Sequence, residues 1–174
     1  KTWKQLTPPD KKTFIITILG YGTISKLIVK KLIYMGFKVQ VWSNKKRNPK
    51  NIGYYYGYDG LHNSLKNTSC LISLLPSTSA TQKLLGLTEF NLLNKDCYFI
   101  NAGRGVTVKE EELIFALKNK ILIGAILDVF SKEPLDEDNP LWELDNVYIT
   151  PHIAGITNAT DYTSKLLRNN FELL

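Results

Sequence analysis

The sequence lacks the long apolar runs that mark membrane and secreted proteins. Lysines interrupt its longest apolar stretches, so none approaches the roughly 20 apolar residues that a membrane-spanning helix needs. The first residues, Lys-Thr-Trp-Lys-Gln, contain no apolar core of a secretion signal. We therefore expect a soluble, cytoplasmic chain without a membrane partner.

Cysteine is also scarce, and the two that occur point to burial. Cys70 and Cys97 each begin an apolar segment, without CxxC spacing and without a histidine nearby. We expect both to be reduced thiols buried in sheet strands, and we predict no metal site. The sequence has no internal repeat and no low-complexity tract. Its 174 residues, of which 44% are hydrophobic and 22% charged, are therefore expected to form one folded domain.

The chain is basic, with a formal net charge of +6 and a pI near 9.2. Such a charge suits nucleic acid, an anionic cofactor or an anionic substrate. Apart from one basic run the lysines are scattered, which is typical of a solvated surface. We find no recognition motif and no stripe of alternating aromatic and basic residues, so a nucleic-acid-binding domain is the less favoured alternative.

The stretch from Phe14 to Ser25 predicts a buried strand, a glycine turn and the start of a helix. Phe-Ile-Ile-Thr-Ile-Leu is a nearly continuous apolar run, as in a strand covered on both faces. Gly20 allows a sharp turn, and Gly22 has no Cβ, so a pyrophosphate could approach the helix N-terminus there. Ser25 stands at the third position, where the dinucleotide fingerprint has glycine, so an ordinary strand-to-helix turn stays an alternative. The apolar residues of the helix recur at helical spacing: Ile24, Leu27, Ile28, Leu32 and Met35.

The residues after the second predicted strand bear on the choice of cofactor. Gly36 is expected to end the helix, and Phe37 to Trp42 alternate as a strand. An NAD site of this type usually has an acidic residue at the next positions, which holds the ribose hydroxyls. Here the acid is missing, and a hydroxyl and cations follow instead: Ser43, Asn44, Lys45, Lys46 and Arg47. This run predicts a site for a 2′-phosphate, with NADP(H) preferred and NAD(H) possible, and a solvated basic loop as the alternative.

The rest of the chain alternates between strands and helices. This alternation predicts an α/β fold of three layers, a doubly wound parallel sheet of the Rossmann type. Residues 1–13 are expected to be a lead-in segment and residues 14–174 the dinucleotide-binding domain, with a helix from about residue 157. His62 is expected on the surface, without a role. Further strands are predicted at residues 71–75, 98–100, 121–127 and 147–149, and a strand or loop at 54–56.

Polar residues suited to the reduction of a 2-oxo acid follow the ends of predicted strands. They are Arg104, Glu133 and His152, and the carboxyl ends of parallel strands share one edge. An imidazolium can protonate the carbonyl oxygen, a carboxylate can keep that imidazole charged, and an arginine can hold the substrate carboxylate. When each of these residues is considered by itself, the simpler interpretation is an ordinary surface, turn or loop residue. Together at one edge they predict an active site.

Five motifs, in this order, resemble those of the D-isomer-specific 2-hydroxyacid dehydrogenases. They are Gly20-Tyr-Gly22, Leu75-Pro76 with its threonine-rich loop, Asn101-Ala-Gly-Arg104-Gly105, Asp128-Val-Phe-Ser-Lys-Glu133-Pro134-Leu135, and Pro151-His152-Ile-Ala-Gly155. Within that family the sequence is most similar to the glyoxylate/hydroxypyruvate reductases of the bacterial A type. That similarity rests on Trp42-Ser43 with the basic run, on Pro140-Leu141-Trp142, and on the residues that follow His152.

The resemblance implies an enzyme that reduces small 2-oxo acids to 2-hydroxy acids by hydride transfer. It implies Arg104, Glu133 and His152 as catalytic residues, Asp128 near the nicotinamide amide, and a homodimer. It also implies a second, substrate-binding domain, of which this chain lacks most. A non-catalytic dinucleotide-sensing module is the alternative. The implied cofactor-binding residues are Gly20, Tyr21, Gly22, Thr23, Ile24, Ser43, Asn44, Lys45, Lys46, Arg47, Leu75, Pro76, Ala102, Arg104, Asp128, His152, Ala154 and Gly155.

Overall fold

A seven-stranded parallel sheet forms the centre of the molecule. The computed structural model describes residues 8–47 and 49–155. The strands lie in the order β3-β2-β1-β4-β5-β6-β7, so the chain starts in the middle, runs to one edge, and then crosses over to fill the other half. This order is that of a doubly wound sheet and confirms the predicted fold class. The helix predicted from about residue 157 lies outside the described residues.

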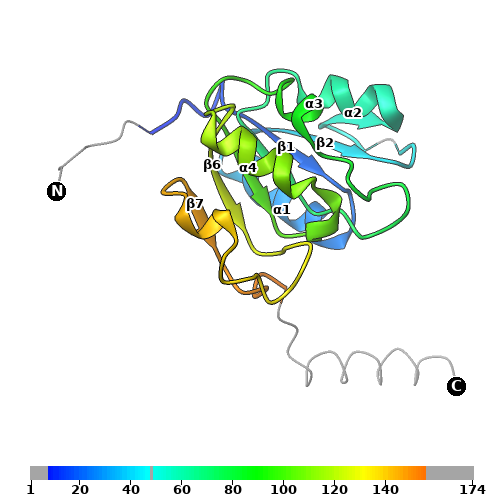
Figure 1. The fold of residues 1–174 in the computed structure, drawn as a ribbon. Coiled ribbons are helices and arrows are strands. Elements are labelled where there is room, and N and C mark those ends of the chain that lie inside the picture. The colour runs from blue at the N-terminus through cyan, green and yellow to red at the C-terminus, as the bar shows by residue number, and fades with distance from the viewer. Residues whose placement is uncertain (1–7, 48, 156–174) are drawn as a thin grey trace, which may run out of the picture.

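The elements follow one another as strand and helix along the chain (Figure 1). The strands are β1 (Ile15–Leu19), β2 (Lys38–Ser43), β3 (Gly53–Tyr56), β4 (Cys70–Ser73), β5 (Cys97–Asn101), β6 (Leu122–Leu127) and β7 (Val147–Ile149). The helices are α1 (Thr23–Tyr34), α2 (Gly57–Leu65), α3 (Leu87–Phe90) and α4 (Glu110–Lys118), with 3-10 turns η1 (Gly105–Thr107) and η2 (Pro140–Glu143).

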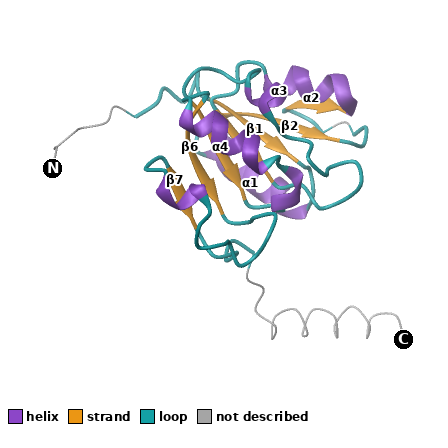
Figure 2. Ribbon diagram, viewed as in Figure 1, coloured by secondary structure: helices purple, strands orange, loops and turns teal. Residues whose placement is uncertain are grey.

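Helices cover both faces of the sheet, giving the expected three layers (Figure 2). The larger core lies on the side of α2, α3 and α4, where fully buried leucines of α2 and α4 pack against Phe99 of β5. The smaller core lies under α1, where Val29 packs against Ile16 and Ile18 of β1. Burying both faces matches the nearly continuous apolar strands of the sequence.

The face that α1 turns to the sheet differs only in part from the one expected, because Ile28 and Leu32 are half-buried against the core as expected. Ser25 and Val29, one turn apart, are the buried residues of this helix. Ile24, Leu27 and Met35, expected on the packed face, are 53 to 62% exposed. A small side chain at residue 25 lets the start of the helix approach the sheet closely, and this approach turns Ile24 and Leu27 outward. Gly36, at φ +87°, follows the helix as predicted.

The two cysteines are buried and unpaired, as expected. Burial raises the pKa of the Cys70 thiol to about 11. Burial, with a further contribution from Cys70, raises that of Cys97 to about 12. Both thiols are therefore protonated at neutral pH and behave as small apolar core residues.

The alignment of neighbouring strands determines where the functional loops begin. Parallel pairing aligns residues at the carboxyl ends of six strands, which are Trp42, Leu19, Ser73, Asn101, Leu127 and Ile149. The loops that follow these residues therefore leave the sheet side by side. None of the helices in the described ranges is long and apolar enough to cross a membrane.

Candidate functional site

A cleft of about 620 Å³ opens at the carboxyl edge of the sheet, over β1, β2, β4 and β5. Its walls come from the glycine turn, the end of β2, the loop after β4 and the loop after β5. Thirteen of the residues expected to bind a cofactor line it: Gly20, Tyr21, Gly22, Thr23, Ile24, Ser43, Asn44, Lys45, Arg47, Leu75, Pro76, Ala102 and Arg104. The cleft is further lined by residues that were not among the expected cofactor-binding residues: Ser25, Trp42, Leu74, Thr78, Thr81 and Gly103.

The glycine turn leaves room for a phosphate at the start of α1. Gly22 is the N-cap residue of the helix, and a Cβ placed on it would meet no protein atom within 4 Å. The first turn of α1 carries no acidic residue. The free N–H groups and the positive end of the helix dipole therefore face open space, and this arrangement suits a pyrophosphate.

Glycine is required at residue 20 for a different structural reason than at residue 22. Its φ is +99°, and a Cβ on it would lie 3.0 Å from the carbonyl oxygen of Leu74. The residue thus combines a left-handed turn with close contact to the loop after β4, and a side chain would oppose both. This contact brings the first and third walls of the cleft together.

The basic run after β2 forms one end of the cleft. Lys45 and Arg47 line it, and no carboxylate side chain is among the lining residues. Arg47 donates from Nη1 to the carbonyl oxygen of Tyr21 at 3.2 Å, which holds its guanidinium against the glycine turn. Lys46 differs from its neighbours: its Nζ lies 5.7 Å from the centre of the Tyr56 ring, and it is not among the lining residues.

A tight turn after β5 presents Arg104. The buried Thr107 side chain donates to the Arg104 carbonyl oxygen at 2.7 Å, and the buried Asn101 side chain accepts from the Gly103 N–H group at 3.2 Å. A Cβ on Gly105 would lie 1.9 Å from the Phe130 carbonyl carbon, so this turn touches the loop after β6 directly. The exposed Arg104 side chain donates from Nη1 to the Gly103 carbonyl oxygen of the same turn at 2.7 Å.

Glu133 and His152 form a close pair. Nδ1 of His152 lies 2.7 Å from Oε2 of Glu133, and the Phe130 N–H group donates to Oε1 at 2.9 Å. The His152 hydrogen bond lowers the pKa of Glu133, the Phe130 bond lowers it further, and the nearby charges of His152 and Arg104 act in the same direction. Residues 19 positions apart therefore meet as a charged carboxylate and an imidazole whose Nε2 stays available.

Asp128 braces the loop that carries His152. Its Oδ1 accepts from the Thr150 hydroxyl at 2.6 Å and from the Ile153 N–H group at 2.9 Å, and its Oδ2 accepts from Ala154 N–H at 3.0 Å. Burial alone would raise the pKa of Asp128, but these hydrogen bonds and the charge of His152 keep it below its usual value. His152 has φ +54°, an unfavourable value for a side-chain-bearing residue, and the bonds on both sides help hold it there.

The expected residues thus separate into two neighbouring groups. The cofactor residues of the first four loops line the cleft together with Arg104. Asp128, His152, Ala154 and Gly155 lie outside its lining and belong to the brace and its loop. His62, expected on the surface, is instead half-buried, with Nε2 3.4 Å from Oε1 of Glu89. Among the described residues no cluster of side chains could hold a metal ion.

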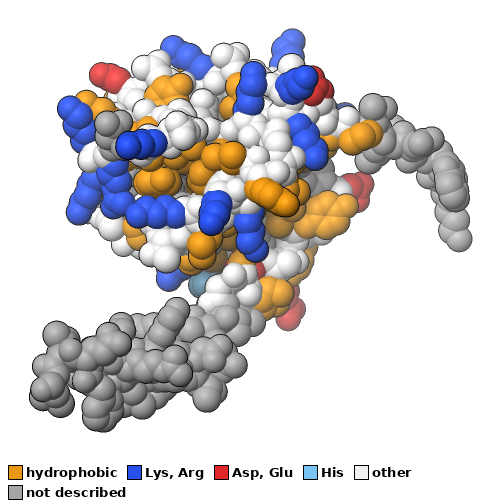
Figure 3. All heavy atoms as spheres, turned by 180° about the vertical axis from the view of Figure 1, so that it is seen from behind, with side chains coloured by type: hydrophobic (Ala, Val, Ile, Leu, Met, Phe, Trp, Pro, Cys, Tyr) orange, Lys and Arg blue, Asp and Glu red, His pale blue; other side chains and the backbone are white. Residues whose placement is uncertain are grey.

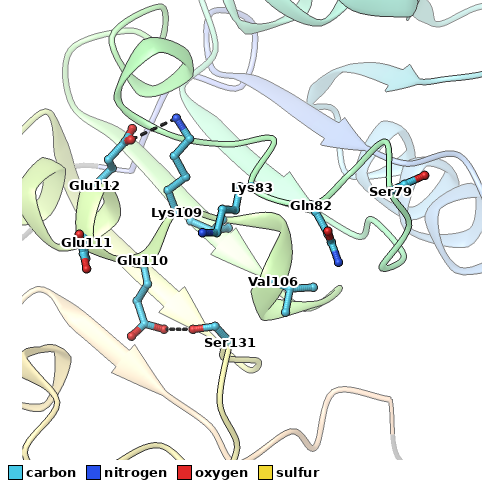
Figure 4. Close-up of a pocket in the computed structure, with 10 residues that line it drawn as sticks. Ser79, Gln82, Lys83, Val106, Lys109, Glu110, Glu111, Glu112 and Ser131 are labelled. Carbon is cyan, nitrogen blue, oxygen red and sulfur yellow. Dashed lines mark hydrogen bonds and ion pairs between the residues drawn. The ribbon is translucent and has the colours of Figure 1, made fainter.

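A larger hollow of about 930 Å³ lies beside the start of α4 (Figure 4). Three of its five charged side chains already have partners: Lys109 pairs with Glu112 at 3.1 Å, and Glu110 accepts from Ser131 at 2.8 Å. Three glutamates on its wall would repel a dinucleotide phosphate. The smaller cleft, whose lining has no carboxylate side chain, is therefore the better candidate for an anionic ligand.

Fold and site together define the class of protein. A doubly wound sheet, a glycine turn facing open space and a paired histidine at the same edge are the features of a dehydrogenase nucleotide-binding domain. Residues 1–154 match the family model of the D-isomer specific 2-hydroxyacid dehydrogenase NAD binding domain. The chain belongs to this family, which confirms the resemblance seen in the sequence.

Named relatives include glyoxylate/hydroxypyruvate reductases A. The protein of Photorhabdus laumondii is 38% identical over 157 residues, 90% of this chain and 50% of its own length. That of Escherichia fergusonii is 37% identical over 168 residues, 95% of this chain and 54% of its own. The chain thus spans about half the length of the curated relatives it matches.

Solved structures of the family superpose closely. A probable 2-hydroxyacid dehydrogenase from Rhizobium etli, in complex with NADP, HEPES and L(+)-tartaric acid, is 33% identical with a TM-score of 0.89, over 98% of this chain and 56% of that one. The NADPH-dependent glyoxylate/hydroxypyruvate reductase of Sinorhizobium meliloti, with NADP and sulfate, is 34% identical with a TM-score of 0.88, over the same shares.

We predict that Asp128→Asn will release the loop that carries His152. An amide keeps one acceptor oxygen and turns its NH₂ group toward a backbone N–H group, and an unsatisfied buried group costs about 1–3 kcal/mol. Hydrogen exchange measured by NMR should show lower protection factors for the Ile153 and Ala154 amides, with the amides of β5 unchanged as a control. Equal protection in both proteins would contradict the brace.

The stabilisation that the Asp128 carboxylate gives to the His152 loop should decrease at low pH. The folded pKa of Asp128 lies below its unfolded value of about 3.9, so the stabilisation is complete above that value. It should be lost as the pH falls through the folded pKa, when the carboxylate gains a proton. In Asp128→Asn the protection of these amides should not change over that range.

Proposed function

We propose that this chain is the cofactor-binding half of a reductase of small 2-oxo acids, of the glyoxylate and hydroxypyruvate class. The observation that carries the proposal is the 2.7 Å pair between His152 and Glu133 at the edge where the cleft opens. Arg104 lines that cleft, and its charge acts on Glu133. The relatives named as glyoxylate/hydroxypyruvate reductases support the substrate class.

Each residue of the site has a role that its contacts suit. A bound nicotinamide cofactor would supply the hydride for the carbonyl carbon. Arg104 would hold the substrate carboxylate and polarise the carbonyl. His152 has Nδ1 committed to Glu133, so its Nε2 would donate the proton to the carbonyl oxygen. Glu133 would hold the imidazole ring in place through its contact with Nδ1.

The preferred cofactor of this domain is NADPH. Lys45 and Arg47 line the adenosine end of the cleft together with the Ser43 hydroxyl, and the lining has no carboxylate that would repel a 2′-phosphate. Gly22 leaves the space that the pyrophosphate requires. The relatives solved with NADP bound support the same choice.

We predict tighter binding of NADPH than of NADH by at least about tenfold. Hydrogen bonds to charged groups contribute about 1.5–3 kcal/mol each, and 1.4 kcal/mol corresponds to tenfold in affinity. Titration calorimetry on this chain measures both constants. Lys45→Ala and Arg47→Ala should weaken NADPH and spare NADH, whereas Lys46→Ala, whose ammonium lies over Tyr56, is the matched control. Equal affinities in the unmodified chain would contradict the assignment.

A second domain should be needed for turnover. The relatives are about twice as long as this chain, and the residues described here form the side of the cleft that rests on the carboxyl edge of the sheet. The opposite wall would exclude water and orient the carbonyl, and loss of orientation can cost several powers of ten in rate. We therefore expect this chain to bind cofactor with little turnover by itself.

The test of the reaction uses the full-length enzyme that contains this domain. His152→Ala should lower the rate of NADPH oxidation with glyoxylate or hydroxypyruvate by about 10²–10⁴-fold, the usual contribution of a general acid. The Kd for NADPH should stay within about twofold, because His152 does not line the cleft. A full rate in this variant would contradict the reductase and favour a dinucleotide-sensing module.

We also infer that the domain associates as a homodimer. Supporting this, apolar side chains on the rear face lie open between scattered lysines (Figure 3). The exposed apolar side chains of the described residues include Tyr34 and Leu27 of α1, and Tyr98, Ile126 and Tyr148 of the sheet, each more than 40% exposed. Large exposed apolar areas favour association, and two-fold dimers are the commonest assemblies. Light scattering should give twice the mass of one 19.8 kDa chain, and a monomer at all concentrations would contradict the inference.

A further inference from the structure

Glu133 belongs to an exposed loop that follows β6. Residues 131–134 are all exposed, and so is His152, with which Glu133 pairs. The buried Phe130 fixes the start of the loop, and its N–H group donates to Oε1 of Glu133 at 2.9 Å. The exposed residues that follow Phe130 need a further anchor if the Glu133 carboxylate is to stay on the imidazole.

Glu110 provides such an anchor from the first turn of α4 (Figure 4). Its Oε2 accepts from the Ser131 hydroxyl at 2.8 Å, and its Oε1 accepts from Nδ2 of Asn139 at 2.8 Å. Figure 4 shows the Glu110 side chain reaching from the helix to Ser131. The two oxygens of one carboxylate therefore hold both ends of residues 131–139, which lie 21 and 29 positions away in the sequence.

Both sides of this contact are themselves well fixed. The helix that carries Glu110 is packed in the larger core through three buried residues, which are Leu113, Ala116 and Leu117. On the loop side, Oδ1 of Asn139 accepts from the N–H group of the buried Leu141 at 2.9 Å and so caps η2. The Glu110 carboxylate thus joins an exposed loop to a rigid helix.

We propose that Glu110 is a positioning residue for the pair of Glu133 and His152. By holding Ser131 and Asn139, it fixes the loop from which Glu133 reaches Nδ1 of His152. The proposal rests on the proposed function, in which this pair takes part in the reduction. Glu110 is not among the residues that line the cleft, so it acts through the loop and not on the cofactor.

The contacts of Glu110 require its two oxygens and not its charge, because a neutral hydroxyl and a neutral amide donate to them. In Glu110→Gln the amide oxygen still accepts from Asn139, and the new NH₂ group donates to the Ser131 oxygen. Ser131 is exposed, so its own proton turns to water. Glu110→Gln should therefore keep kcat within about twofold of the unmodified enzyme.

The test uses the full-length enzyme and NADPH oxidation with glyoxylate or hydroxypyruvate. Glu110→Ala removes both contacts, and it should lower kcat by about tenfold or more because the catalytic pair loses its alignment. The Kd for NADPH should stay within about twofold, since the cleft is unchanged. Glu111→Ala is the matched control: it removes the same charge from the same helix turn, but from an exposed residue, and should leave kcat unchanged.

A double-mutant cycle separates positioning from a general structural role. If Glu110 acts through Glu133, Glu110→Ala should change kcat little in an enzyme that already carries Glu133→Ala. An equal loss in both backgrounds would overturn the proposal, and so would a full rate in Glu110→Ala. Failure of the proposed function would appear separately, as an unmodified full-length enzyme that does not reduce these acids.

A measurement on this chain by itself does not depend on turnover. The His152 hydrogen bond lowers the pKa of Glu133, and the Phe130 bond and the charges of His152 and Arg104 add to this effect. When the loop is released in Glu110→Ala, the pKa of Glu133, followed by NMR, should rise toward its usual value. It should stay in place in Glu110→Gln and Glu111→Ala. An unchanged pKa in Glu110→Ala would overturn the proposal.

Discussion

Parallel pairing of the strands is the constraint on which the site depends. The residues that pair across the sheet from Trp42 to Ile149 stand at the same height along their strands. Loops that are far apart in sequence therefore leave the sheet side by side. Contacts that leave no room for a side chain then join these loops. Gly20 packs on the Leu74 carbonyl, and Gly105 packs on the backbone of Phe130. The geometry of the sheet and these backbone contacts thus place the cleft beside the loop of Glu133.

The pair of Glu133 and His152 depends on a second layer of hydrogen bonds. His152 stands in a loop with positive φ, and Glu133 stands in another loop, so neither is held by the sheet directly. Asp128 follows β6 immediately and uses both carboxylate oxygens on the His152 loop. Phe130 N–H binds the other oxygen of Glu133. The rigid sheet thus fixes the pair through residues that need not touch a substrate themselves.

Hydrogen bonds also hold the basic run after β2 in place. Cations alone would attract any phosphate, and their long side chains would leave its position loosely defined. The structure adds short hydrogen bonds from Ser43 and Tyr54 to the backbone of Lys45, and ties Arg47 to the glycine turn. Such a preformed arrangement of polar groups lowers the entropy lost when a ligand binds.

The sequence by itself determined the features that depend on neighbours along the chain. Apolar strands, the glycine turn, the helix stop at Gly36 and the absence of an acid after β2 are local patterns, and they sufficed for the fold class and the family. Residue motifs also placed Arg104, Glu133 and His152 at one edge, since parallel strands leave no other arrangement.

Tertiary structure alone decided the features that depend on contacts through space. The packed face of α1 follows from the close approach at Ser25, and apolar spacing could not reveal that Ile24 and Leu27 face outward. Lys46 lies over an aromatic ring from another strand, so its charge is directed away from its two basic neighbours. The brace at Asp128 and the contact between Tyr54 and Ser43 join residues 11 to 26 positions apart. No local pattern encodes such pairs, because their partners are chosen by how the sheet and loops pack.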